Sequence, residues 1–181
     1  MMKKKGFTII ELMIVIAILA VLLGIITTVA TASIRKGRER RRQAMRETLQ
    51  NGIAAYRERK DEWPGKLEEW AKDPPRGKGT VITLETKDYD EVVQELLKVS
   101  AGKSPQNRVL DPVGLLVMRS SENNGSSAGR DYREVVKKNG KYGKRMSVKD
   151  MTIVYPNVDN GKAYRYVIKY NTLSDSVTVG W

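Results

Sequence analysis

The chain of 181 residues contains no cysteine and no histidine, and its 33 basic and 21 acidic residues give a formal net charge of +12 at pH 7. The missing side chains exclude disulfides, cysteine-containing zinc sites, Ser-His and Cys-His catalysis and imidazole metal ligation. The length suits one modest domain plus an anchor, and the basic balance allows anionic partners such as nucleic acid or phospholipid headgroups.

The first element is an apolar helix that follows a short basic head at residues 1–6. From Leu12 to Ile34 the chain carries no charged residue, and this run of about 23 residues spans about 35 Å as a helix. A bilayer core is about 30 Å thick. The pattern therefore predicts a transmembrane helix over residues 7–34.

The helix is expected to continue in water over residues 35–62, which are rich in Arg, Glu, Lys, Gln and Ala. Apolar residues recur there at helical spacing and form one stripe: Met45, Leu49, Ile53 and Tyr56. Proline cannot continue a helical hydrogen-bond ladder. We therefore predict one helix from Phe7 to about Asp61, with its stop at Trp63-Pro64-Gly65.

The remainder, residues 63–181, is predicted to be a globular domain. Asp88-x-x-Glu91 resembles a capping box in front of an amphipathic helix that ends near Gly102. The other expected elements are a helical turn at Lys66–Ala71, a strand at Thr80–Leu84, an extended segment at Val109–Met118 and a loop at Glu122–Gly129.

The end of the chain is rich in Val, Ile, Thr and Tyr, and turn residues divide it into three segments. These segments, Met151–Tyr155, Tyr164–Tyr170 and Ser176–Gly180, predict an antiparallel meander. The expected fold class is α+β, with the long N-terminal helix packed on a small antiparallel sheet.

One motif directly precedes the apolar run. Residues 3–11 read Lys-Lys-Lys-Gly-Phe-Thr-Ile-Ile-Glu. This closely resembles the class III signal of type IV prepilins and type II secretion pseudopilins. The resemblance implies a leader at residues 1–6, a cut by prepilin peptidase between Gly6 and Phe7, N-methylation of Phe7, and a role in filament assembly for Glu11.

The chemistry of the motif agrees with that resemblance. Gly6 has no side chain to obstruct a protease, and Lys3, Lys4 and Lys5 would hold the leader at the cytoplasmic face. Glu11 needs a partner, because a carboxylate beside an apolar run is costly in a membrane. The amine of Phe7 could pair with Glu11 of its own chain or of a neighbouring subunit, and both pairings are open, as is simple exposure of Glu11 to interfacial water.

The resemblance implies a structural pseudopilin and not an enzyme, without cofactor or metal. Its partners would be the peptidase and methyltransferase, identical or related subunits, the inner-membrane assembly platform and the membrane itself. A weaker resemblance covers Tyr56–Trp70, which is similar to the pseudopilin pattern at the end of the long helix. The absence of a cysteine pair and of a dense C-terminal Asp cluster favours a pseudopilin over an adhesive pilin. The nearest calcium candidates, Asn157, Asp159 and Asn160, fit a plain turn.

Rival interpretations remain. A pilus or competence-pilus subunit could bind DNA through a basic patch. That patch would comprise Arg130, Tyr132, Arg133, Lys137, Lys138, Lys141, Tyr142, Lys144 and Arg145.

Ordinary signal peptidase could instead cut after Ala30-Thr31-Ala32 and release a soluble exported protein starting at Ser33. An anchored enzyme would need carboxylates or a Ser-Lys pair such as Ser147 and Lys149.

One charge pattern opposes the orientation that the motif requires. Basic residues outnumber the three leader lysines directly after the span, and the positive-inside rule would place that side in the cytoplasm. They are Arg35, Lys36, Arg38, Arg40, Arg41, Arg42 and Arg46. Because the peptidase motif needs a cytoplasmic Gly6, we expect the inner membrane, a cytoplasmic N-terminus and a periplasmic C-terminal domain. The basic run would contact lipid phosphates or acidic faces of neighbouring subunits.

Overall fold

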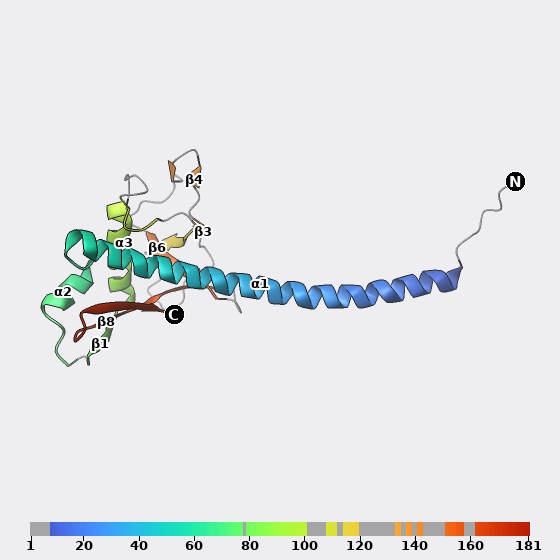
Figure 1. The fold of residues 1–181 in the computed structure, drawn as a ribbon, viewed down its shortest axis with the longest axis horizontal. Helices are drawn as coiled ribbons and strands as arrows, with labels where there is room; N and C mark the ends of the chain where they lie inside the picture. The colour runs from blue at the N-terminus through green and yellow to red at the C-terminus, as the bar shows by residue number, and fades with distance from the viewer. Residues whose placement is uncertain are drawn as a thin grey trace. The chain divides into compact units, whose positions relative to one another are not determined.

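The computed structural model describes residues 8–77, 79–100, 108–111, 114–119, 133–134, 137–138, 141–142, 151–157 and 162–181. Its internal contacts divide the chain into two compact units, Met1–Arg40 and Arg41–Trp181. Helix α1, Ile9–Lys60, begins in the first unit and is also the first element of the second (Figure 1). All the other described helices and strands belong to the second unit. The predicted α+β class, a long N-terminal helix followed by small antiparallel sheets in a pilin-like layout, is confirmed.

The extent of α1 agrees with the prediction, but its stop has a different cause. The helix ends at Lys60, and Asp61 takes a left-handed backbone conformation with φ of 58°. The amide of Asp61 donates to the carbonyl of Arg57 at 2.8 Å and closes the last turn. The chain therefore leaves the helix three residues before Pro64, and the proline only prevents its resumption.

The apolar stripe of α1 in the second unit forms part of the core, as predicted. Met45, Leu49, Ile53 and Tyr56 are all buried. Burying one such side chain contributes about 1.5–3 kcal/mol. Gly52 lies beside this stripe, and a Cβ built there would come within 2.9 Å of Leu110 Cδ1. The glycine is thus the residue that lets the segment containing Leu110 approach the helix closely.

Two short elements lead from α1 to the second long helix. Helix α2 covers Lys66–Lys72 and strand β1 covers Val81–Thr83, each within one residue at either end of the predicted element. Helix α3, Thr86–Ser100, begins before the predicted capping box at Asp88, and the amide of Tyr89 bonds to the carbonyl of Glu85 at 2.9 Å. The box assignment is therefore wrong: Asp88 lies inside the first turn, where its charge still favours the positive helix end.

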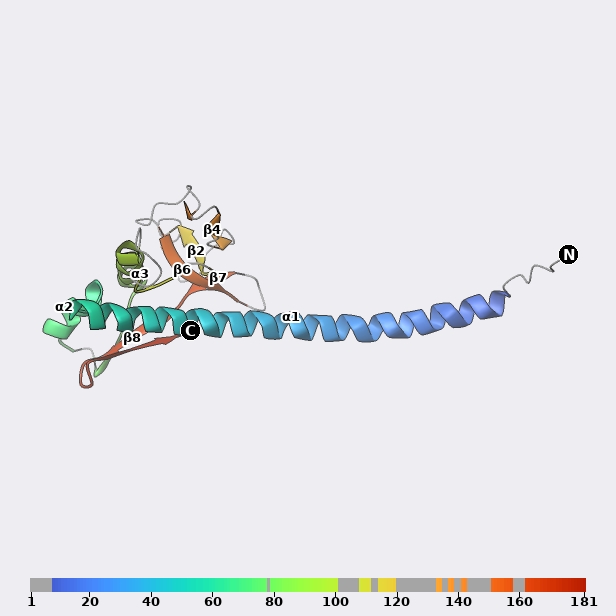
Figure 2. The same ribbon diagram turned by 45° about the horizontal axis from the view of Figure 1, so that its top comes forward.

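The strands form two main antiparallel sheets. The four-stranded sheet has the order β3-β2-β6-β7, and the three-stranded sheet has the order β1-β8-β9. Figure 2 labels β2, β6 and β7 of the first sheet and β8 of the second. A separate pair joins β4 to β5. The bounds are β2 Leu116–Arg119, β3 Arg133–Glu134, β4 Lys137–Lys138, β5 Lys141–Tyr142, β6 Met151–Pro156, β7 Ala163–Arg165, β8 Val167–Asn171 and β9 Ser176–Gly180.

The predicted meander differs from the observed pairing. The expected strand Tyr164–Tyr170 is two strands in two sheets, because β7 pairs with β6 whereas β8 pairs with β9 and β1. The break falls at Tyr166, which is buried and donates its hydroxyl to the carbonyl of Arg42 at 2.9 Å. Its ring also packs 4.8 Å from that of Tyr155. The residue between the two strands therefore contacts α1.

A buried ion pair joins α3 to the four-stranded sheet. Asp90 accepts two bonds from the guanidinium of Arg165, at 2.8 and 2.9 Å, and one from the Thr152 hydroxyl at 2.5 Å. The side chains of Asp90 and Arg165 are each 8% exposed. The neighbouring Tyr89 hydroxyl donates to the carbonyl of Ile153 at 2.7 Å. Burial raises the pKa of Tyr89 well above its usual value, so this hydroxyl stays protonated.

A second polar cluster joins the β8–β9 turn to the end of α1. Asp175 accepts bonds from Trp63 Nε1 at 2.8 Å and from the Tyr170 hydroxyl at 2.7 Å, and it forms an ion pair with Arg57. The bond from Arg57, followed by those from Tyr170 and Trp63, holds the pKa of Asp175 below its usual value. Side chains from α1, from the connection that follows α1 and from β8 thereby fix this turn.

Candidate processing and assembly site

A reciprocal pair of side chains starts α1. The backbone amide and the hydroxyl of Thr8 each donate to Oε2 of Glu11 at 2.9 Å. The amide of Glu11 donates back to Oγ1 of Thr8 at 3.3 Å. This is a capping box, with Thr8 at the cap and Glu11 in the first turn. It satisfies two backbone amides that the helix itself leaves without acceptors.

The pair also fixes the Glu11 carboxylate at the positive end of the helix, where a negative charge is favourable. Both bonds use Oε2, and within the part of the chain that the structure describes no donor contacts Oε1. The sequence interpretation named only the amine of Phe7 as a partner and missed Thr8. The signal was present, since Thr-x-x-Glu before an apolar run is the standard pattern of a capping box.

The other predicted site residues lie outside the described residues. These are the leader lysines Lys3, Lys4 and Lys5 and the scissile pair Gly6 and Phe7. Cleavage, methylation and pairing of the amine with Glu11 therefore stay predictions. The described structure starts at Thr8, the second residue after the expected cut.

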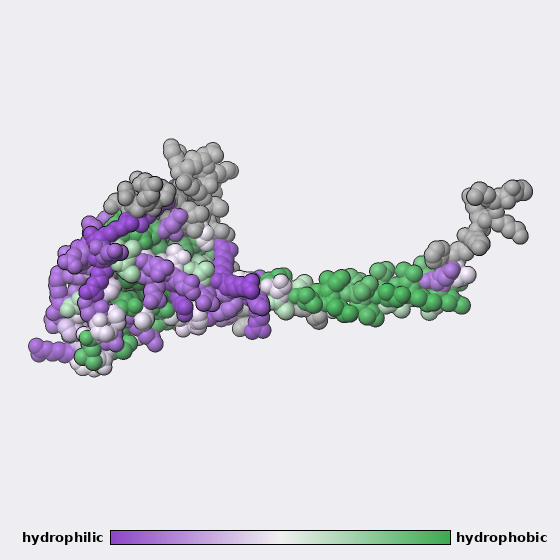
Figure 3. Space-filling model, in the orientation of Figure 1, coloured by the Kyte–Doolittle hydropathy of each residue, from purple (hydrophilic) through white to green (hydrophobic). Residues whose placement is uncertain are grey.

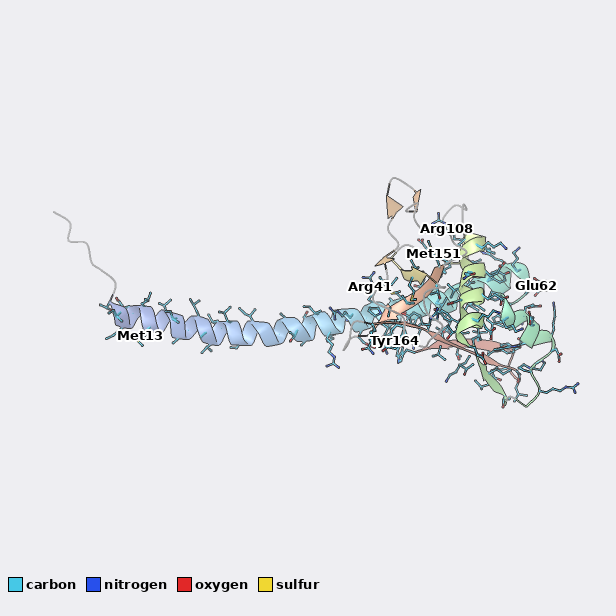
Figure 4. The ribbon with its side chains drawn as sticks, turned by 180° about the vertical axis from the view of Figure 1, so that it is seen from behind. Met13, Arg41, Glu62, Arg108, Met151 and Tyr164 are labelled. Atoms are coloured by element: carbon cyan, nitrogen blue, oxygen red, sulfur yellow. The ribbon has the colours of Figure 1, made fainter. Side chains whose placement is uncertain are left out.

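The apolar half of α1 is exposed to an unusual degree. The large apolar side chains described between Ile9 and Ile34 are each 45–79% exposed, and the side chains around Met13 project away on all sides of the helix (Figure 4). Figure 3 shows their surface as a continuous hydrophobic stretch. Among the described residues, α1 is the one helix long and apolar enough to cross a membrane. An apolar surface of this kind fits a single-pass membrane anchor.

Part of the basic run after the anchor is held inside the second unit. The guanidiniums of Arg42 and Arg46 lie 4.2 and 4.7 Å from the ring centre of Trp181. Arg41 donates to the carbonyl of Gly114 at 3.1 Å. These three residues therefore have contacts within their own unit, and the expectation that the run faces lipid or neighbouring subunits stays a prediction.

The side chains of most residues in the candidate DNA-binding, enzyme and calcium sites lie outside the described part of the chain. The side chains of the proposed DNA-binding patch, residues 130–145, lie outside the described part, as do Ser147 and Lys149. Of the calcium candidates, Asn157 is described, and its amide donates to the carbonyl of Lys162 at 2.7 Å, next to the Pro156–Ala163 pair of β6 and β7. The described residues contain no group of three acidic side chains able to hold a metal ion.

One comparison with known proteins found a match, and it lies at the N-terminus. A family model described as a prokaryotic N-terminal methylation motif matches residues 1–27. No match was found among curated proteins or among solved structures. The matched segment covers the basic head, the capping box and most of the apolar run, and it implies processing by prepilin peptidase and assembly into pilin-like filaments. The chain therefore carries at residues 1–27 the signature of type IV pilin-like prepilins, which supports a pilin-like or pseudopilin protein.

Proposed function

We propose that this chain is a structural subunit of a type II secretion pseudopilus. The subunit rests in the bacterial inner membrane with its N-terminus in the cytoplasm and residues 63–181 in the periplasm. After removal of the leader it is extracted by the assembly platform into a filament that drives protein export. The observation that carries the proposal is the methylation signature at residues 1–27, which includes the start of an exposed apolar helix.

Glu11 is the residue that we assign to assembly. Its Oε2 is held by Thr8, which leaves Oε1 for the positively charged amine of a Phe7 exposed by cleavage between Gly6 and Phe7. In a stack of subunits that amine belongs to a neighbour, and the pairing sets the axial register. The attraction is strong because water is scarce around the two charges in a bundle of apolar helices.

The apolar half of α1 supports the same role. A helix that is apolar on every side can contact lipid before assembly and other helices afterwards. Such an exchange needs no change in the backbone, since the helix already satisfies its own hydrogen bonds. The export of protein by a moving filament is thus a mechanical function, for which no catalytic residue is required.

The test separates processing from assembly. Mass spectrometry of the native protein should find an N-methylated Phe7 as its first residue. Glu11→Gln keeps an acceptor for Thr8 but removes the charge, so we expect normal processing and at least a tenfold loss of filaments. The exposed Glu58 on the same helix offers a control, and Glu58→Gln should assemble normally. A start at Ser33, or full assembly of Glu11→Gln, would refute the proposal.

A deletion strain separates the pseudopilus from a pilus. We expect export of secreted proteins to fall while surface pili persist. Loss of DNA uptake or of adhesion with normal export would favour the pilus alternative instead.

A further inference from the structure

The inference concerns a group of basic side chains at the C-terminal end of the apolar run. Four basic residues and one acidic residue follow Ile34 within the first unit and give a net charge of +3. We name the four basic residues the basic collar: Arg35, Lys36, Arg38 and Arg40. All four are exposed, and a Cβ built on Gly37 between them would meet no atom within 4 Å. The described protein therefore does not cover this part of α1.

The dimensions of the basic collar match a headgroup layer. Its residues rise about 7.5 Å along the helix, and each polar layer of a bilayer is about 5–8 Å thick. The uncharged run that precedes it already spans the hydrocarbon core. When the apolar run lies in the core, the basic collar lies at the depth of the lipid phosphates.

The charges are spread widely around the helix. At about 100° per residue the four side chains cover about 200° of its circumference. A protein partner with one acidic face would contact a narrower sector, whereas a lipid layer surrounds the helix. Lys and Arg beside a span interact favourably with anionic headgroups, and each strengthens the attraction by roughly fivefold.

We propose that the basic collar binds anionic phospholipid headgroups in the leaflet on the C-terminal side of the anchor. Bound lipid fixes the depth of the subunit in the membrane before assembly. The inference rests on the anchoring part of the proposed function alone and applies whichever filament the subunit joins.

The test uses the full chain, which has no cysteine and so accepts a single fluorescent label at Ser33→Cys. The labelled protein is placed as a monomer in phosphatidylcholine vesicles that contain a minority of phosphatidylglycerol. Quenching by nitroxide-labelled phosphatidylglycerol is then compared with quenching by nitroxide-labelled phosphatidylcholine. We expect roughly two- to fivefold enrichment of the anionic lipid near the label, and its decline at high salt.

Two charge-matched variants decide the outcome. The first replaces the basic collar with glutamine and should abolish the enrichment. The second makes the same change at four exposed basic residues of the other unit, Arg76, Lys87, Lys98 and Lys169, and should retain it. Equal quenching by both lipids in the unchanged protein would overturn the inference, as would equal losses in the two variants. Enrichment retained without the basic collar, together with failed assembly, would also overturn it and indicate an acidic protein partner. Because the vesicles contain monomers, failure of the filament proposal leaves this readout intact.

Discussion

At the scale of single residues, Thr8 has two roles in the first turn of α1. Its hydroxyl accepts from the Glu11 amide and donates to the Glu11 carboxylate, so one small side chain both starts the helix and orients the acidic group. Loss of the hydroxyl would remove one of the two described bonds to the Glu11 carboxylate and leave only the Thr8 backbone amide to orient it. The position of the charge, and not only its presence, depends on this threonine.

Thr8→Ala should therefore lower the stability of the first turn of α1 by about 1 kcal/mol. Thr8→Ser keeps the hydroxyl and serves as the matched control. Hydrogen exchange of the Glu11 amide, measured in the full chain in detergent, should be roughly fivefold faster in Thr8→Ala. Equal exchange rates in the two variants would show that the capping box does not stabilise the helix start.

The Asp175 cluster gives a pH dependence at the residue scale. Burial, followed by the hydrogen bond to Asp175 and the charge of Asp175, raises the pKa of Tyr170 to about 12. Because this value exceeds the usual tyrosine pKa, the stabilisation is complete below about pH 10 and is lost as the pH rises through about 12. Asp175 behaves oppositely: its lowered pKa gives stability above about pH 4 that is lost on further acidification.

Asp175→Asn keeps a hydrogen-bond acceptor but removes the charge. The pKa of Tyr170 should then fall towards that of an ordinary tyrosine. The measurement is the phenolate absorbance in alkaline titration, with Tyr170→Phe used to identify the contribution of this residue. An unchanged titration curve in Asp175→Asn would mean that burial alone sets the pKa.

At the scale of elements, two of the three glycines of α1, Gly37 and Gly52, lie in opposite surroundings. A Cβ on Gly52 would lie 3.3 Å from Val109 O and closer still to Leu110, whereas Gly37 is open. Alanine favours a helix over glycine by about 1 kcal/mol wherever space allows. Local propensity is therefore equal at the two sites, and only packing distinguishes them.

Gly37→Ala should raise the stability of α1 by up to about 1 kcal/mol, whereas Gly52→Ala should destabilise the second unit by about 1–2 kcal/mol through overpacking. Urea unfolding of the full chain in detergent, followed by tryptophan fluorescence, reports on the second unit, and amide exchange around residue 37 reports on the helix. Stabilisation by both substitutions would show that the Leu110 segment yields without cost.

At the scale of the whole molecule, the two units depend on different physical effects. The described large apolar side chains of α1 between Ile9 and Ile34 are exposed and form no core. The stability of this segment therefore depends on contacts with lipid or with other helices. The second unit has a core and uses buried polar bonds to fix its elements. Asp90 matters most there, because it joins α3 to β6 through Thr152 and to β7 through Arg165.

Asp90→Ala should cost about 3–5 kcal/mol, because it leaves the buried Arg165 without its charged partner. The double variant Asp90→Leu and Arg165→Met should be less destabilised, since both charges are gone. Chemical unfolding of the full chain measures both, with the exposed Asp73→Ala as the control. A double variant as unstable as Asp90→Ala would contradict this account of the pair.

The predictions from sequence were mostly correct for features that depend on interactions between residues close together in the chain. The extent of α1 and its stripe from Met45 to Tyr56 depend on contacts within the helix or on one buried face, and both were predicted. The capping box at Thr8 is local as well, and its Thr-x-x-Glu pattern is present in the sequence, but it was not predicted. The start of α3 was misplaced because Asp88 and Glu91 match the capping pattern, although the helix begins at Thr86.

The sequence by itself determined the processing signal, the uncharged run and the α+β class, because composition and short-range periodicity are enough for these. Only the tertiary structure decided the division of Tyr164–Tyr170 between two sheets, since the Tyr166 hydroxyl bonds to a carbonyl 124 residues away. It also decided which arginines remain exposed after the anchor, because Arg42 and Arg46 lie against Trp181. Strand pairing and ring contacts depend on residues far apart in the chain, and no local pattern encodes them.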